Sequence, residues 1–422
     1  MHKLINYLLS QKVFLKKILP IELLRMVKKK LMGAEISKYR SKPIKTEIYC
    51  QMPFGVNLIG DICVEIGLGQ SMRLLAGQLD LSNVNFGIHN FQIADNVRRN
   101  DHSWDSKVQE NTPYGINLFH INPQEMGLAY VRLDKKIWKN RYNIGFWLWE
   151  LEQFPQDCID SIKFLDEIWT PSEFTSRSIR KVTDKPVYTI PYYVTAETDP
   201  NCNRASFGLP ENKFLYLVMF DSNSTMLRKN PVAAIEAFKH AFAAESRDVG
   251  LVIKVNNPNE KNLATLREML AGYENIYYIT EIMEKAKVNS LIGCVDVFVS
   301  MHRAEGFGLV MAEAMLLKTA CIATNWSSNT EFMNSDTACM VSTKMIKIDE
   351  SEGCYPKGSI WADPSVEEAA AYMKKLKQEP AFYRDMVERA HAYISYVLGK
   401  EKIVTMMEDR LTQIDRIIRN NA

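Results

Sequence analysis

Two glutamates lie on either side of a glycine-rich turn, Glu305 before it and Glu313 after it. The apolar run before them predicts a strand that ends near Ser300, and the run after the turn predicts a helix that carries Glu313 in its first turns. The turn, Gly306-Phe307-Gly308, would leave free backbone N–H groups beside a carboxylate. Free amides at a helix start suit a phosphate and a carboxylate suits vicinal hydroxyls, so the segment predicts a site for a diphosphate joined to a polyol. A carboxylate held there is expected to be ionised.

Two cations, Arg228 and Lys229, come shortly before Pro231, at the start of another predicted helix. Cations in that position oppose the positive end of the helix dipole, so a bound anion is the natural reason for their placement. A pair of solvated surface charges is the alternative.

A further glycine-rich loop, with Gly67 and Gly69, follows the first predicted strand and opens a helix. It lacks the third glycine and the later acidic residue of a dinucleotide fingerprint, so alone it indicates little. His120 ends a predicted strand on the side of the expected cleft, where a structural role and a ligand contact are both open. The aromatic run 146–150, which includes Trp147 and Trp149, favours core packing over a sugar-stacking platform.

The elements that position these residues alternate between strand and helix, which predicts α/β domains with parallel sheets covered on both faces. The polar, turn-rich segment 192–212 separates two blocks of this kind. Two such domains in tandem leave a cleft at the carboxyl ends of their strands. The strands are expected at 54–59, 84–89, 116–121, 143–148, 167–169, 187–191, 213–220, 251–255, 276–279, 297–300 and 320–324.

The composition is that of a globular protein. Of 422 residues, 46% are hydrophobic and 24% are charged, which predicts two or three domains. Eight cysteines are scattered singly, so neither a zinc site nor a disulfide framework is expected, and a reducing cytosol is the expected compartment. No apolar stretch approaches the ~20 residues that a membrane-spanning helix requires.

Residues 1–45 differ from the rest of the chain in charge. They contain twelve Lys or Arg and two Glu, a net charge of +10, whereas the remaining residues carry a net charge of −8. Apolar residues at helical spacing predict two amphipathic helices here. Two interpretations stay open: a flank packed on the protein, and a surface that docks on an anionic membrane.

The segment around Glu305 and Glu313 resembles the E-x7-E signature of the family 4 retaining glycosyltransferases, which have the two-domain GT-B fold. The resemblance covers most of residues 51–390. It implies that Glu305 contacts the donor sugar together with the backbone of the turn that contains Gly306, Phe307 and Gly308. It implies that Glu313 binds the ribose hydroxyls of the nucleotide.

The resemblance also assigns the other candidates. Arg228 and Lys229 would hold the donor diphosphate and stabilise the departing nucleotide, although this chain has Ser224 where many relatives have an arginine. The loop with Gly67 and Gly69 would lie near the donor phosphate and the acceptor, and His120 would lie near the donor sugar.

The fold class that follows is α/β, with two Rossmann-like GT-B domains, an interdomain cleft and a helical C-terminal tail. We divide the chain into a basic amphipathic segment (1–45), an acceptor domain (46–195), a nucleotide-sugar donor domain (196–385) and C-terminal helices (386–422) that pack back on the first domain.

The expected activity is retaining transfer of a hexosyl unit, of mannosyl type, from a UDP- or GDP-linked sugar to a glycan or lipid-linked acceptor in polysaccharide or lipopolysaccharide biosynthesis. By the resemblance, the donor phosphate oxygen takes the acceptor proton and no protein nucleophile acts. The chain has no Asp-x-Asp, so neither a metal nor a cofactor is expected.

The expected location is cytoplasmic and peripheral on the inner face of the membrane, without a nucleic-acid partner. Two alternatives stay open: a nucleotide-sugar 2-epimerase of similar fold, and a non-catalytic sugar-binding assembly protein.

Overall fold

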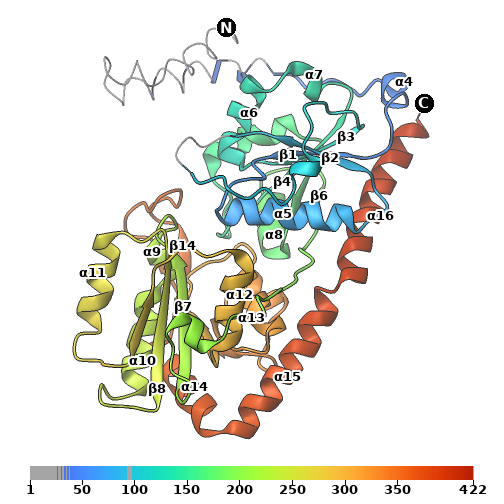
Figure 1. The fold of residues 1–422 in the computed structure, drawn as a ribbon. Coiled ribbons are helices and arrows are strands. Elements are labelled where there is room, and N and C mark those ends of the chain that lie inside the picture. The colour runs from blue at the N-terminus through green and yellow to red at the C-terminus, as the bar shows by residue number, and fades with distance from the viewer. Residues whose placement is uncertain are drawn as a thin grey trace.

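The computed structural model describes residues 39–92 and 97–421, and before these it describes Met26, Lys30, Gly33, Ala34, Ile36 and Ser37. The amphipathic segment expected at 1–45 therefore lies almost entirely outside the described residues. The described chain forms two α/β domains joined by an extended linker and by a long C-terminal helix (Figure 1). The predicted α/β fold class is confirmed.

The first domain contains a six-stranded sheet of order β2-β1-β3-β4-β5-β6, in which all neighbouring strands are parallel. These strands are largely buried, which is why they appear in the sequence as continuous apolar runs. Its strands are β1 (Val56–Gly60), β2 (Phe86–Asn90), β3 (Ile116–His120), β4 (Tyr142–Phe146), β5 (Glu167–Thr170) and β6 (Val187–Thr189). Its α-helices are α4 (Thr46–Tyr49), α5 (Gly67–Asp80), α6 (Met126–Arg132), α7 (Lys135–Trp138) and α8 (Glu173–Arg180).

Three buried asparagines fix the register of the central strands in the first sheet. Asn57 Nδ2 donates to Asn117 Oδ1 over 2.9 Å, and Asn117 Nδ2 donates to Asn143 Oδ1 over 2.8 Å. A slip by one residue would leave these amides unpaired in the core, which is costly. The ladder therefore holds the carboxyl ends of β3 and β4, and the loops after them, at fixed places beside the cleft.

The second domain contains a parallel sheet of order β12-β11-β10-β7-β8-β9. Its strands are β7 (Phe214–Asp221), β8 (Val249–Asn256), β9 (Ile276–Ile279), β10 (Val297–Ser300), β11 (Ala320–Thr324) and β12 (Cys339–Val341). Its helices are α9 (Met226–Lys229), α10 (Pro231–Ala241), α11 (Glu260–Met269), α12 (Lys285–Cys294), α13 (Leu309–Leu316) and α14 (Val366–Gln378), with the 3-10 turn η5 (Ser328–Glu331) after β11. All eleven predicted strands are present, each within two residues of its expected ends.

An antiparallel hairpin that the sequence did not predict follows β12. Its strands are β13 (Thr343–Lys347) and β14 (Ile360–Pro364). Although it belongs to the second domain, Ile348, Tyr355 and Trp361 pack in one apolar cluster with Trp147 and Trp149 of the first domain. The hairpin thus bridges the two domains on one side of the cleft.

The chain ends in two helices, α15 (Pro380–Val397) and α16 (Lys400–Arg419), of which α16 runs from the second domain back to the first (Figure 1). Arg410 pairs with the fully buried Glu167 of β5, and Asp415 accepts a hydrogen bond of 3.0 Å from the hydroxyl of Tyr49. These contacts fix α16 on the first domain. Among the described residues, no helix is both long enough and apolar enough to cross a bilayer.

Candidate active site

A cavity of about 1060 Å³ lies between the two domains. The loops that follow β1, β4, β7 and β10 line it, so it sits at the carboxyl ends of strands from both sheets, as expected for paired α/β domains. Its volume suits a ligand of the size of a nucleotide sugar or larger. Of the residues predicted from the sequence, the cavity is lined by Gly67, Arg228, Lys229, Glu305, Gly306, Phe307 and Gly308.

Glu305 contacts two cations in this cavity. Its Oε1 pairs with Lys229 Nζ and lies 3.3 Å from Arg228 Nη1. Burial alone would raise the pKa of Glu305, but Lys229 and then Arg228 outweigh burial and lower this pKa to about 2. The site therefore holds an ionised carboxylate at any physiological pH.

Arg228 and Lys229 differ in what they can offer a ligand. Arg228 is 7% exposed, and its Nη1 also donates to the carbonyl oxygen of Ala304 over 2.9 Å. Lys229 is the more accessible of the two side chains, at 26%. In this arrangement both cations face Glu305, so Lys229 is the cation that can turn toward an anion while Arg228 keeps the carboxylate paired.

The loop 305–308 is fixed by three serines. The amide of Glu305 donates to Ser327 Oγ over 3.0 Å, and the Ser328 hydroxyl donates to the carbonyl oxygen of Glu305 over 2.7 Å. From the first domain, the Ser172 hydroxyl donates to the carbonyl oxygen of Gly306 over 2.8 Å. Both domains therefore hold the backbone that carries Glu305.

Gly308 ends this loop with φ +95°, a conformation that side chains other than glycine rarely adopt. It is the N-cap of α13 and provides no side-chain cap. The first amides of α13, at Leu309 and Val310, thus stay without intrahelical partners at the cavity wall. This helix start can bind a phosphate.

Glu313 lies behind this helix start rather than on the cavity wall. Its side chain is 1% exposed and its Oε2 lies 2.6 Å from Lys285 Nζ, and Lys285 does line the cavity. We expected an ionised carboxylate here, but burial raises the pKa of Glu313, which Lys285 only partly offsets. Lys285 stands between Glu313 and the cavity.

His120 is likewise absent from the cavity wall. It is 2% exposed, its ring stacks on Phe146 at 5.6 Å, and its Nε2 lies 2.6 Å from Ser71 Oγ. Burial lowers the pKa of His120 to about 4, so it is neutral. Ser71, which also bonds to the hydroxyl of Tyr192, stands between His120 and the cavity.

The glycines of the first-domain loop have separate roles. Gly67 begins α5 with no atom close to the place where a Cβ would be, and it lines the cavity. Gly69 does not line the cavity, and a Cβ there would lie 1.9 Å from the carbonyl oxygen of Val64. Gly69 is therefore required by close packing of α5 on the preceding loop.

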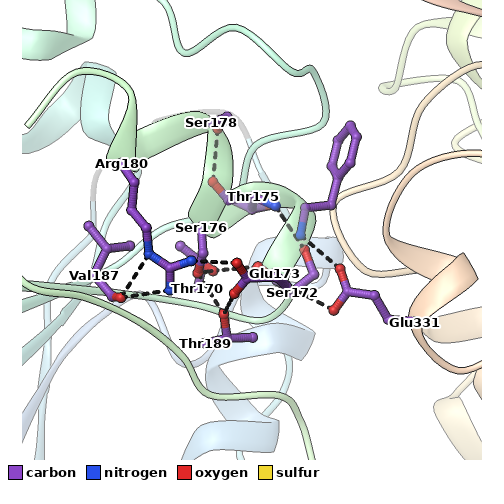
Figure 2. A network of polar contacts seen from close by, with 11 residues as sticks. Thr170, Ser172, Glu173, Thr175, Ser176, Ser178, Arg180, Val187, Thr189 and Glu331 are labelled. Atoms are coloured by element: carbon purple, nitrogen blue, oxygen red, sulfur yellow. Dashed lines mark hydrogen bonds and ion pairs between the residues drawn. The ribbon is translucent and has the colours of Figure 1, made fainter.

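A polar network at the start of α8 ties the first domain to the second (Figure 2). Glu331 of η5 accepts hydrogen bonds from the amides of Glu173 and Phe174, over 2.9 and 2.7 Å. Ser172 is the N-cap of α8 and accepts from the amide of Thr175. The helix start is thus capped by residues of both domains, directly beside the loop 305–308.

Within the described residues, one group combines three side chains that could ligate a metal: Cys63, His102 and Asp105. His102 Nδ1 and Asp105 Oδ2 already contact each other at 2.9 Å, and both side chains are mostly exposed. We assign no metal to this group.

Comparisons with known proteins agree with this architecture. Among solved structures, sucrose-phosphate synthase from Thermosynechococcus elongatus is 13% identical, with a TM-score of 0.64 over 86% of this chain and 99% of that one. HepE of Anabaena, solved in complex with UDP-glucose, is 13% identical, with a TM-score of 0.63 over 86% of this chain and 100% of that one. The chain has the GT-B fold.

Other comparisons extend this result. A glycosyltransferase from Rickettsia africae is 14% identical, with a TM-score of 0.59 over 87% of this chain and 100% of that one. Residues 203–393 match the family model described as "Glycosyl transferases group 1". The second GT-B domain is therefore similar to the group 1 glycosyl transferases. A search of curated protein sequences gave no match.

Several residues at this GT-B cavity were not predicted from the sequence. Glu150 and Lys285 line the cavity, and Cys354 and Tyr355 reach it from the hairpin. Glu150 ends the aromatic run 146–150, whose Trp147 and Trp149 are buried in the core, although Trp149 also lines the cavity. The other three have no local signal, because their place depends on contacts between distant segments.

Proposed function

We propose that this protein is a retaining glycosyltransferase that moves a hexosyl unit from a UDP- or GDP-linked sugar to a glycan or lipid-linked acceptor. The observation that carries the proposal is the ionised Glu305 beside the start of α13 in the interdomain cavity, within a domain similar to the group 1 glycosyl transferases. A carboxylate and free amides side by side suit sugar hydroxyls and a diphosphate.

The neighbouring GT-B structures support a nucleotide-sugar donor, since HepE was solved with UDP and with UDP-glucose. In this chain the amides of α13 would face the diphosphate and Lys229 would turn from Glu305 toward it. Glu305 would bind hydroxyls of the sugar, and Glu313 would reach the ribose once Lys285 moves aside. The hexose, of mannosyl type in our expectation, and a role in polysaccharide or lipopolysaccharide assembly remain part of the proposal.

The reaction we propose is a substitution on one face of the anomeric carbon. The acceptor oxygen bonds to this carbon as its bond to the diphosphate oxygen breaks, and a phosphate oxygen takes the acceptor proton. The side chains of Lys229 and Arg228 and the start of α13 would stabilise the charge on the departing nucleotide, so neither a metal nor a protein nucleophile is required. Activity should persist in EDTA.

The test is a thermal-shift screen of the full chain with UDP-glucose, UDP-galactose, UDP-N-acetylglucosamine, GDP-mannose and the free nucleotides. A ligand at 100 times its Kd should stabilise the fold by about 2.7 kcal/mol. We expect a nucleotide sugar to stabilise the wild-type protein. This stabilisation should be lost in Glu305→Gln and kept in Glu245→Gln, a control at an exposed glutamate. No stabilisation by any of these ligands would contradict the proposal.

The membrane part of the proposal depends on residues 1–45 and their net charge of +10. Full-length protein should bind vesicles that contain phosphatidylglycerol, and a variant without residues 1–38 should not. Binding should weaken with salt, because exposed charges are screened over ~8 Å at physiological ionic strength. Equal binding of both proteins would contradict this part alone.

A further inference from the structure

The hairpin β13–β14 brings a piece of the second domain to the first-domain wall of the cavity. Tyr355, in the connection between the two strands, is 4% exposed, with its ring 5.7 Å from Trp149 and 6.4 Å from Trp361. The guanidinium of Arg228 lies 6.0 Å from the centre of the same ring. Residues of both domains thus pack against Tyr355 at the edge of the cavity.

Glu150 of the first domain lines the same cavity as Tyr355. It follows Trp149 in the loop after β4 and lines the cavity. A Cβ placed on Gly306 would lie 3.7 Å from Glu150 Cγ and 3.3 Å from the carbonyl oxygen of Trp149. The side chain of Glu150 therefore borders the loop 305–308 at van der Waals distance, and the carbonyl oxygen of Trp149 leaves little room for a side chain at residue 306.

The two glutamates at this place differ in their partners. Glu305 is paired with Lys229 and Arg228, whereas Glu150 forms no ion pair with any residue in the described part of the chain. Burial and then the neighbouring Glu150 carboxylate raise the pKa of Tyr355, so the phenol keeps its proton. Glu150 hydrogen-bonds the phenol and interacts with Arg228 only at longer range, beyond ion-pair distance. This carboxylate and the protonated phenol together offer acceptor and donor groups to one hydroxyl, or to two neighbouring hydroxyls.

We propose that Glu150 and the hydroxyl of Tyr355 form a second sugar-hydroxyl subsite in the cavity, built from one residue of each domain. This inference rests on the proposed function and deepens it. Because Glu150 borders Gly306, the sugar whose hydroxyls it binds is the transferred hexosyl unit. The first sugar of the acceptor has the same hydroxyl chemistry, and the experiment separates these two sources.

The test variants are Glu150→Gln and Tyr355→Phe, which keep side-chain size. The control is Glu152→Gln, at an exposed glutamate two residues from Glu150. For each full-length variant, we would measure hydrolysis of the best nucleotide sugar without acceptor, transfer to acceptor, and the thermal shift with the free nucleotide. The same rates would be measured with the 3-, 4- and 6-deoxy forms of the donor sugar.

If the subsite holds the transferred sugar, Glu150→Gln should lower kcat/KM for hydrolysis and for transfer by about tenfold or more, with the free-nucleotide shift unchanged. The variant should also lose the wild-type preference for the donor over one deoxy analogue, which a purely structural role would not cause. Loss of transfer with normal hydrolysis would support the subsite and assign it to the acceptor.

The subsite would be overturned if Glu150→Gln and Tyr355→Phe had the same rates and deoxy-sugar preferences as Glu152→Gln. The proposed function would then stay in place. Failure of wild-type protein to bind any nucleotide sugar would overturn the proposed function and this inference with it. If Tyr355→Phe lowers the melting temperature, Glu150→Gln, whose side chain is only partly buried, decides the question.

Discussion

The hydroxyl of Ser172, in the first domain, donates a hydrogen bond of 2.8 Å to the carbonyl oxygen of Gly306, in the second. Ser172 is at the start of α8, where Glu331 of the second domain accepts hydrogen bonds from the amides of Glu173 and Phe174 (Figure 2). The cleft is thus closed at one edge by polar contacts, and these contacts act on the backbone beside Glu305. Domain closure and placement of Glu305 are therefore coupled.

Ser172→Ala should impair both stability and donor binding. The variant loses the hydrogen bond to Gly306 and the N-cap bond from the amide of Thr175, at about 1 kcal/mol of unfolding free energy each, and it frees the loop 305–308 from the first domain. We expect KM for the nucleotide sugar to rise about tenfold with a smaller change in kcat. Ser178→Ala is the control, since the hydroxyl of the buried Ser178 donates within α8 to the carbonyl oxygen of Thr175 and to no other residue in the described part of the chain. Equal kinetics of the two variants would contradict the coupling.

Lys229→Met should change the acid dependence of stability. The pKa of Glu305 is about 2 in the folded protein and 4.5 as the reference, so its ionised form stabilises the fold above pH 4.5 and this contribution is lost as the pH falls toward 2. The contribution is at most about 3 kcal/mol. Urea unfolding between pH 3 and pH 7 should show a shallower pH dependence in Lys229→Met than in wild type. Parallel curves would mean that Lys229 does not hold Glu305 ionised.

His120 should contribute a pH dependence of its own through burial of its neutral ring. Its pKa falls from 6.5 to about 4 on folding, so the neutral form stabilises the fold above pH 6.5, and this stability is lost as the pH falls to 4. His120→Gln should lose part of the wild-type decline in unfolding free energy between pH 6.5 and pH 4. An unchanged decline would contradict a neutral, buried His120.

Much of the fold was predictable from the sequence because its strands are buried on both faces, and such strands are continuous apolar runs. The turn around Gly308 was predictable because a positive φ at a helix start selects glycine. The hairpin was missed because its strands carry exposed and buried residues in short, mixed order. Its position depends on the packing of Trp361 and Tyr355 against the first domain.

The candidate site was predictable only where neighbours in sequence are neighbours in space. Glu305 and the turn after it fall in this class, as do Arg228 and Lys229. The sequence could not show that Ser71 of α5 would separate His120 from the cavity, or that Lys285 would cover Glu313. Ser172 and Gly306 are 134 positions apart, so only the closure of the two domains reveals their contact.

The measurement that tests the central claim most directly is turnover of nucleotide sugars by wild type, Glu305→Gln and Glu245→Gln. With the donor identified by thermal shift, release of the free nucleotide should proceed in wild type and in Glu245→Gln. It should fall about 100-fold or more in Glu305→Gln, because the sugar loses the carboxylate that positions it. Circular dichroism should show all three proteins folded. Turnover by folded Glu305→Gln at the wild-type rate would contradict the assignment of this cavity as the active site.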